Sequence, residues 1–167
     1  LEEVRSQHPS AELVGSDLYG CWNVKYPDPG TPMTLVVPTG KQLGYLRSLL
    51  LSTIRYFPDT VQEAVLVVQE ANEAAMVLFV EQWDHAAALP LKLVRSGGGA
   101  YNHARSINLG LQAASTDLVV VCDDDVEWLD AGSLTELRRL FSEESVAVAA
   151  PRLVLQKGAR PMIVGGP

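Results

Sequence analysis

The pattern of apolar positions changes at residue 33, where short apolar runs begin to alternate with longer segments of mixed polarity. The runs occupy residues 33–37, 64–68, 91–94, 118–122 and 146–150. Runs of this length that are apolar almost throughout are typical of strands buried on both faces of a parallel sheet. We therefore predict a buried strand at each run.

Between the runs, apolar residues recur at the three- and four-residue spacing of one helix face. Residues 43–57 follow this spacing, and Pro58 ends the helix because proline lacks an amide hydrogen. Similar patterns fill residues 75–82, 104–114 and 134–141. Alternating strands and helices predict a layered α/β domain with right-handed crossovers, in which ligands bind outside the carboxyl ends of the strands.

Residues 1–32 lack a sustained helical or strand period and are rich in proline and glycine. We predict an extended lead-in over this range and a separate domain over residues 33–167. Large apolar side chains in a linker gain most by covering apolar area, so the lead-in is expected to pack on the domain. The side chains expected to do so are Tyr19, Trp22, Val24 and Tyr26.

Composition agrees with a folded domain, since 47% of the 167 residues are hydrophobic and 20% are charged. The formal net charge of −7 makes nucleic acid an unlikely partner, because phosphate backbones attract basic surfaces. The longest purely apolar run, residues 74–80, is far shorter than the roughly 18 residues of a membrane-spanning helix. Cys21 and Cys122 are too few for a disulfide framework, so a reducing cytoplasm and a buried thiol at Cys122 are expected.

Three adjacent carboxylates, Asp123, Asp124 and Asp125, follow the apolar run at 118–122. Adjacent carboxylates repel one another, and a hard divalent cation such as Mg²⁺ or Mn²⁺ relieves this repulsion while completing its shell with water and substrate phosphates. The alternative is a solvated acidic turn that caps the next helix. The position at the end of a buried strand favours metal and phosphate chemistry.

Two other phosphate chemistries fit the residues less well. A P-loop needs G-x-x-x-x-G-K-[ST], but Gly40-Lys41 is followed by Gln42 and lacks the spaced glycine. Aspartyl phosphatases carry their aspartates near the start of the domain with a lysine and further acids downstream. Here Lys157 is the sole lysine after Asp125.

A glycine triplet, residues 97–99, follows the apolar run at 91–94 and precedes a predicted helix. Glycines allow close approach of the backbone to a ligand, and a helix start presents free amide groups. Asn102, Arg105 and Asn108 recur along one side of that helix. The alternatives are a flexible turn and a solvated helix face. Trp83 and Trp128 are expected to be packing residues, and the alternative for Trp128, which follows the aspartates, is to border a ligand pocket.

Taken in order, four features resemble a family 2 glycosyltransferase of the GT-A fold, a Rossmann-like three-layer αβα sandwich. They are Pro38-Thr39 after the first run, the acidic Gln69-Glu70 loop, the segment GAYNHARSINLG at 99–110, and the aspartate triplet. The lead-in WNVKYPDP at 22–29 is similar to the segment before such domains in large bacterial polysaccharide-making enzymes. The resemblance covers residues 22–167.

The resemblance implies transfer of a sugar from a nucleotide diphosphate sugar, commonly a UDP-sugar, to a hydroxyl of a carbohydrate or glycolipid acceptor. It places Pro38 and Thr39 against the base and ribose, with Gln69 or Glu70 where the family has a base-contacting aspartate. Further contacts to the nucleotide sugar come from Asn102, Arg105, Asp123 and Asp124.

For the metal, the resemblance implies that Asp125 ligates Mg²⁺ or Mn²⁺, with Asp123 beside it near the ribose or diphosphate and Asp124 as the competing choice. The ion would assist departure of the diphosphate. An inverting enzyme of this kind also needs a carboxylate general base, yet no acid follows Glu144. We expect the chain to be part of a longer protein with further domains. We also expect the 167-residue chain alone to be inactive as a transferase.

Two other functions stay open. One is a noncatalytic glycosyltransferase-like module that binds nucleotide or serves as a scaffold. The other is a sugar-phosphate nucleotidyltransferase, which normally has a basic, glycine-rich loop after its first strand, where this chain offers only Gly40-Lys41. The expected location is the cytoplasm, including the inner face of the membrane.

Overall fold

The computed structural model describes residues 2–17, 19–40, 42–151, 153–157 and 160–164. The chain divides into two compact units, Gly30–Ala131 and a second unit made of Leu1–Pro29 with Gly132–Pro167. Residues 33–167 are predicted from the sequence to form one domain, and this domain assignment stays a prediction.

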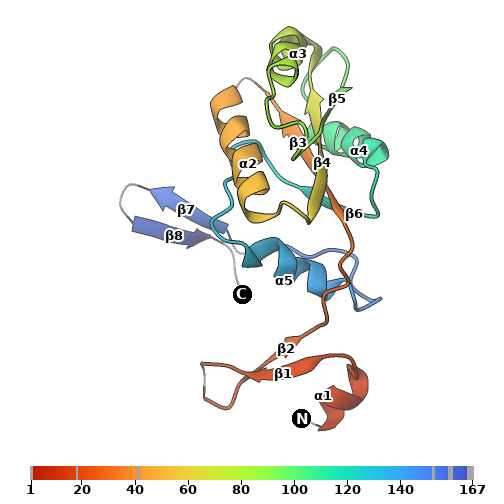
Figure 1. Ribbon diagram of the computed structural model, residues 1–167, viewed down its shortest axis with the longest axis vertical. Helices are drawn as coiled ribbons and strands as arrows, with labels where there is room; N and C mark the ends of the chain where they lie inside the picture. The colour runs from red at the N-terminus through yellow and green to blue at the C-terminus, as the bar shows by residue number, and fades with distance from the viewer. Residues whose placement is uncertain (1, 18, 41, 152, 158–159, 165–167) are drawn as a thin grey trace. The chain divides into compact units, whose positions relative to one another are not determined.

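Four parallel strands form the sheet of the Gly30–Ala131 unit, in the order β5-β4-β3-β6 (Figure 1). Their bounds are β3 (Met33–Thr39), β4 (Val61–Val68), β5 (Leu91–Arg95) and β6 (Leu118–Val121). Each coincides with a predicted apolar run, so the predicted parallel α/β sheet is confirmed.

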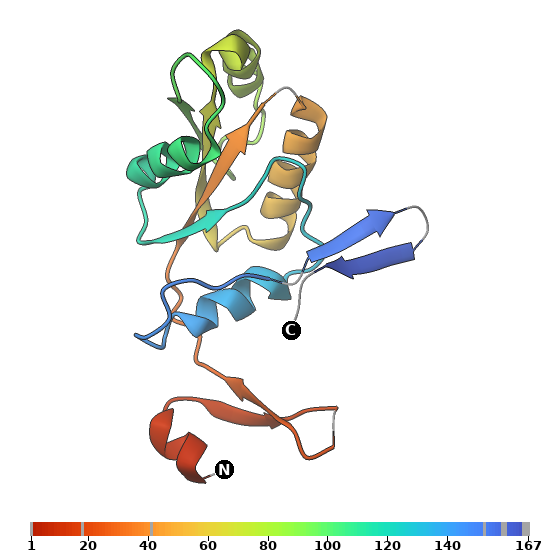
Figure 2. The same ribbon diagram turned by 180° about the vertical axis from the view of Figure 1, so that it is seen from behind.

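Helices cover both faces of this sheet. They are α2 (Leu43–Tyr56), α3 (Glu73–Glu81), which follows the 3₁₀ turn η1 (Glu70–Asn72), and α4 (His103–Ala113). Figures 1 and 2 show α2 and α4 on opposite sides of the strands, which is the expected three-layer αβα arrangement.

The core lies between the layers because the strands are apolar on both faces. Every residue of β3 is buried. On one side Val36, Val65 and Val67 form a buried cluster against Leu109 and Ala113 of α4. The opposite helix, α2, contributes a fully buried leucine set: Leu46, Leu49 and Leu50. Each such side chain contributes about 1.5–3 kcal/mol relative to exposure.

The second unit contains short elements that are best described by themselves. They are α1 (Glu2–Gln7), the antiparallel pair β1 (Glu12–Gly15) and β2 (Trp22–Lys25), α5 (Gly132–Leu140), and the antiparallel pair β7 (Leu153–Lys157) and β8 (Arg160–Val164). Residues 1–32, for which the sequence predicts an extended lead-in, thus contain one short helix and two short strands in the part that the structure describes. Tyr19, Trp22 and Val24 are exposed, and packing of the lead-in on the domain stays a prediction.

The strand predicted at residues 146–150 is wrong, since the structure has no strand there and Val148 is 84% exposed. Alanine fills most of this run, and alanine is depleted in strands because it offers little area to pack. The preceding residues form turns instead, in which Val146 N–H donates to the Glu143 carbonyl at 3.0 Å.

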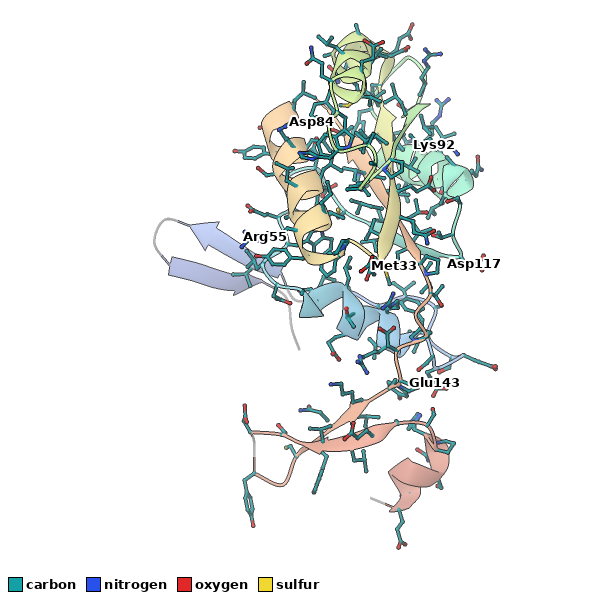
Figure 3. All side chains as sticks on the ribbon, in the orientation of Figure 1. Met33, Arg55, Asp84, Lys92, Asp117 and Glu143 are labelled. Atoms are coloured by element: carbon teal, nitrogen blue, oxygen red, sulfur yellow. The ribbon has the colours of Figure 1, made fainter. Side chains whose placement is uncertain are left out.

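The carboxyl ends of the strands are where the loops of interest emerge. Figure 3 labels residues at the other end of the sheet, Met33 at the start of β3 and Asp117 just before β6.

Within the described parts of the chain, no helix is both long and apolar enough to cross a bilayer.

Candidate functional site

A pocket of about 350 Å³ lies where the strand order reverses at β3. β3 lies between β4 and β6, so the strand order reverses at β3, and the carboxyl end of the strands at such a switch point is the usual ligand position in open α/β sheets. The pocket is lined by Pro38, Thr39, Gly40, Gln42, Gln69, Tyr101, Asp123, Asp124 and Asp125. It thus brings together most of the residues that the sequence singled out.

Strand register places the aspartate loop alongside the end of β3. Val121, the last residue of β6, pairs with Val36, whereas β3 continues to Thr39. The Cys122 N–H donates to the Val36 carbonyl at 3.2 Å, so the loop leaves β6 beside the final residues of β3. The three aspartates therefore follow β6 beside the last residues of β3, and all three line the pocket.

The middle aspartate joins the two loops. Asp124 is half-buried, and its Oδ2 accepts hydrogen bonds from Thr39 Oγ1 at 2.8 Å and from the Gly40 N–H at 3.1 Å. Hydrogen bonds to a charged group contribute about 1.5–3 kcal/mol each when buried, and less at this partial exposure. Asp124 is thus the residue that ties the loop after β6 to the loop after β3.

Asp123 and Asp125 are exposed and line the pocket on either side of Asp124. Among the described residues, no three or more His, Cys, Asp and Glu side chains gather as a complete metal cage. Mg²⁺ needs no such cage, since one or two carboxylates plus substrate phosphates and water satisfy it. The donor set in this pocket fits that mode, and it favours Asp123 and Asp125 over Asp124 as the protein ligands.

The far end of the aspartate loop is anchored to α2 through Trp128. This side chain is 8% exposed, meets Phe57 edge-to-face at 5.3 Å, and donates from Nε1 to Thr53 Oγ1 at 3.0 Å. The backbone N–H of Trp128 also donates to Ser52 Oγ at 3.2 Å. The expected packing role of Trp128 is confirmed, and the side chain does not line the pocket.

Tyr101 is a pocket residue that the sequence analysis missed. Its hydroxyl lies 2.8 Å from His103 Nδ1. Partial burial raises the pKa of Tyr101, and the negative charges of Asp123 and Asp124 raise it further, so the hydroxyl stays protonated at neutral pH. Only its place in the segment before the predicted helix could have pointed to it.

A second pocket of about 270 Å³ lies beside the glycine triplet and shares Gln69 with the first. It is lined by Gln69, Glu70, Ala71, Gly97, Gly98 and Gly99. Gly97 and Gly99 have φ angles of 81° and 101°, a region that side-chain-bearing residues rarely adopt. A Cβ on Gly98 would lie 2.7 Å from Glu70 Oε2. The triplet therefore lines the pocket with a backbone conformation and a close approach to Glu70 that glycine tolerates best.

Two predicted site residues lie outside the lining of both pockets. Asn102 caps α4, its Oδ1 accepting from the Arg105 N–H at 2.9 Å. The Arg105 guanidinium lies behind Gly97, where a Cβ would be 3.3 Å from its Nη2. Both side chains shape the start of α4, and their contact with a ligand stays a prediction.

Cys122 takes no part in the chemistry of the site. Burial raises the pKa of its thiol to about 12, with further contributions from the three neighbouring aspartates. The thiolate is the reactive form of cysteine, so the raised pKa disfavours reaction of this thiol at neutral pH. Cys122 as a whole residue has intermediate exposure, so the burial predicted from the sequence holds for the thiol and not for the whole residue.

The parallel α/β sheet with its pocket at the switch point agrees with the GT-A type of domain that the sequence resembles. The chain belongs to the glycosyl transferase family 2, whose sequence profile matches residues 34–161. A comparison with curated protein sequences gave no significant match.

Solved structures with a similar fold include glycosyltransferases. The mannosyltransferase PcManGT from Pyrobaculum calidifontis, in complex with GDP-Man and Mn²⁺, has a TM-score of 0.60 and 21% identity over 77% of this chain and 37% of that protein. TarS 1-349 from S. aureus has a TM-score of 0.51 and 19% identity over 66% of this chain and 32% of that protein.

A further similar structure is 4-diphosphocytidyl-2C-methyl-D-erythritol synthase from Anaerococcus prevotii, with a TM-score of 0.50 and 16% identity over 66% of this chain and 52% of that protein. At such identities these similarities concern the fold. The chain spans between about a third and about half of the length of these three proteins.

Proposed function

We propose that this chain is the donor-binding part of a glycosyltransferase domain that transfers a sugar from a UDP-sugar to a hydroxyl acceptor, with Mg²⁺ or Mn²⁺ and inversion at the transferred carbon. The family supports the transfer of a sugar from a nucleotide donor. PcManGT was solved with GDP-Man and Mn²⁺, which supports a metal-bound nucleotide sugar in this fold.

The observation that carries the proposal is the charge of the pocket. Its described lining residues include three aspartates and no lysine or arginine. A nucleoside diphosphate is itself an anion and would be repelled by this lining. Asp123 and Asp125, left exposed by the tie at Asp124, are placed to hold the cation that brings the donor in.

The roles of the other residues follow from their positions. When bound, Mg²⁺ or Mn²⁺ supplies positive charge that stabilises the departing diphosphate. Pro38 and Thr39 offer the end of β3 to the base and ribose. Gln69 lies in both pockets and Glu70 lines the second, so their polar groups are placed to recognise the base.

The transfer needs one group beyond those assigned here. The acceptor oxygen forms a bond to the anomeric carbon while the bond from that carbon to the diphosphate oxygen breaks. The proton of the acceptor hydroxyl passes to a general base. We assign no residue of this chain to that role, and we place the base and the acceptor site in the remainder of a longer protein.

The biological setting is also a proposal. We infer a role in bacterial glycan or polysaccharide synthesis, with a carbohydrate or glycolipid acceptor, in the cytoplasm or at the inner face of the membrane. It rests on the similarity of residues 22–29 to the segment before such domains. The net charge of −7 further argues against nucleic acid as the acceptor.

Calorimetry with UDP tests the donor site. We expect UDP to bind in Mn²⁺ and not in EDTA, and Asp125→Ala to weaken binding by about a hundredfold or more, since a metal ligand is lost. Asp59→Asn, an exposed aspartate before β4, is the matched control and should bind UDP as the wild type does. Heat independent of Mn²⁺, or equal binding by Asp125→Ala, would contradict the proposed metal site.

A transfer assay distinguishes the open alternatives. The chain alone is expected to bind UDP without sustained sugar transfer. If the full-length protein binds UDP yet transfers no sugar from any UDP-sugar, the noncatalytic module is favoured. Release of pyrophosphate from UTP and a sugar phosphate would instead identify a nucleotidyltransferase.

A further inference from the structure

Tyr101 is the one aromatic side chain among the described residues that line the first pocket. The other lining residues are polar, acidic or small, apart from Pro38. Tyr101 is 55% exposed, so a large apolar face is available at the mouth of a polar pocket. An aromatic ring in that position can bury considerable area against a ligand.

The Tyr101 ring is oriented by its contact with His103. Its hydroxyl shares a 2.8 Å hydrogen bond with Nδ1 of His103, and the two rings are 6.1 Å apart at 60°. His103 is the first residue of α4, and Asn102 caps that helix through the Arg105 N–H. A side chain that is already oriented loses less rotamer freedom when a ligand binds. The arrangement thus suits a binding contact.

Its position within the pocket indicates which part of the donor it meets. Tyr101 lines the same pocket as Asp123, Asp124 and Asp125, the carboxylates where the metal-bound diphosphate would lie. Gln69 belongs to both pockets and Glu70 to the second, so we place the base toward the second pocket, with Pro38 and Thr39 of the first pocket beside the base and ribose. The sugar is attached to the diphosphate on the side opposite the nucleoside, and Tyr101 is the aromatic lining residue that can contact it.

We propose that Tyr101, oriented by His103, packs against the sugar ring of the donor and so distinguishes a nucleotide sugar from the nucleotide alone. A pyranose presents C–H groups on its faces, and an aromatic ring contacts these while its hydroxyl keeps a hydrogen-bond partner. The inference rests on the proposed function and deepens it, because it names a residue that selects the donor by its sugar.

Calorimetry in Mn²⁺ with UDP and with UDP-glucose, UDP-galactose and UDP-N-acetylglucosamine tests this. We expect at least one UDP-sugar to bind more tightly than UDP. Tyr101→Ala should weaken that sugar nucleotide by about tenfold and UDP by less than about twofold, since only the sugar contact is lost. Tyr101→Phe keeps the ring, so its affinity for that UDP-sugar should fall by less than about threefold. The loss of affinity in His103→Ala should lie between those of Tyr101→Phe and Tyr101→Ala.

Tyr45→Ala provides a matched control, because Tyr45 is also 55% exposed but lies on α2 outside the pocket lining. It should bind every nucleotide as the wild type does. Equal weakening of UDP and the UDP-sugar by Tyr101→Ala, no weakening of either, or no preference of the wild type for any UDP-sugar would overturn the inference. Failure of the wild type to bind UDP with Mn²⁺ would contradict the proposed function itself.

Discussion

A single glycine sets how closely α4 approaches the sheet. Gly110 faces β3 and β4, and a Cβ at this position would overlap Cγ1 of Val36 and lie 3.2 Å from Cγ2 of Val67. Both valines belong to the fully packed cluster beneath α4. Since α4 begins at His103, which is hydrogen-bonded to Tyr101, this close contact also sets the position of the pocket wall.

We predict that Gly110→Ala destabilises the protein although alanine favours helices. The added methyl group must displace Val36 in a packed core, which costs about 1–3 kcal/mol and exceeds the gain of roughly 1 kcal/mol in helix propensity. Gly44→Ala is the matched control, because a Cβ there meets no atom within 4 Å and should raise stability. Urea unfolding measures both, and a more stable Gly110→Ala would contradict the close packing.

Residue identity alone reveals only part of this site. The aspartates were predicted from their residue type and their position at a strand end, whereas Pro38, Thr39 and Gln69 were indicated by the family resemblance. The sequence could not separate Asp124 from its neighbours, because that difference depends on which carboxylate meets Thr39 and Gly40. Tyr101 was missed for the same reason, since no local pattern shows that a tyrosine before a helix faces a pocket.

At the scale of elements, the segment after β6 is held at both ends. Cys122 pairs with β3, and Trp128 packs on α2 through Phe57 and Thr53. The exposed Asp123 and Asp125 lie between these anchors. A segment fixed in this way presents its carboxylates in one geometry, which a metal site requires.

We predict that Trp128→Phe weakens Mn²⁺-dependent UDP binding, because losing the hydrogen bond to Thr53 loosens the aspartate loop. The expected loss of stability is about 1–2 kcal/mol. Trp83→Phe is the matched control. Trp83 is 5% exposed and donates from Nε1 to the Leu89 carbonyl at 2.9 Å, away from the aspartate loop. If both variants lose UDP affinity equally below their melting temperature, the anchoring role is contradicted.

The elements that were predicted correctly share one property, a strong local pattern. Strands β3 to β6 are dense in β-branched residues and leucine, and α2 ends where Pro58 follows. The predicted strand at 146–150 consists largely of alanine, and only the surroundings decide its conformation. The pair β7 and β8 was missed because an antiparallel hairpin depends on pairing between its own strands as much as on composition.

A polar network links three strands at the end of the sheet opposite the pocket. Glu63 of β4 accepts from Thr34 Oγ1 of β3 at 3.0 Å and from the Ser115 N–H before β6 at 2.8 Å. Burial raises the pKa of Glu63, but the hydrogen bonds from Ser115 and Thr34 and the charge of Lys92 together outweigh it, so the pKa is lowered.

We predict that Glu63 stabilises the fold at neutral pH and loses this effect in acid. Its folded pKa lies below its unfolded value of about 4.3, so the contribution is complete above that pH and disappears as pH falls through the folded pKa. Glu63→Gln should cost about 1 kcal/mol at pH 7 and progressively less below about pH 4. Glu81→Gln, at an exposed position on α3, should leave stability unchanged. A pH-independent cost for Glu63→Gln would contradict the prediction.

For the whole molecule, the acidic charge and the proposed function agree. A net charge of −7 would repel an anionic donor at long range, so recruitment must be local. A cation held by Asp123 and Asp125 provides this without a basic surface. Donor binding should therefore depend strongly on the metal ion and only weakly on ionic strength, unlike binding to a basic patch.

An ion pair joins the two segments that make up the second unit, which are distant in sequence: Leu1–Pro29 and Gly132–Pro167. Arg138 of α5 bonds Asp28 at 2.6 Å, and their side chains are 9% and 26% exposed. Nearby, Arg139 Nη1 donates to the Tyr26 carbonyl at 2.9 Å. Removing one charge of such a pair weakens the stabilisation of the other, which lies largely out of contact with water, and this is costly.

We predict that Asp28→Asn loosens residues 1–29 from α5 and lowers the stability of this unit by about 2 kcal/mol, less than for a fully buried pair because Asp28 is partly exposed. Limited proteolysis should then cut the first 29 residues several times faster than in the wild type. Glu136→Gln removes the exposed partner of Arg139, whose Nε lies 3.4 Å away, and should change neither stability nor cleavage measurably. If Asp28→Asn and Glu136→Gln are cut at the same rate, the ion pair does not hold the lead-in to α5.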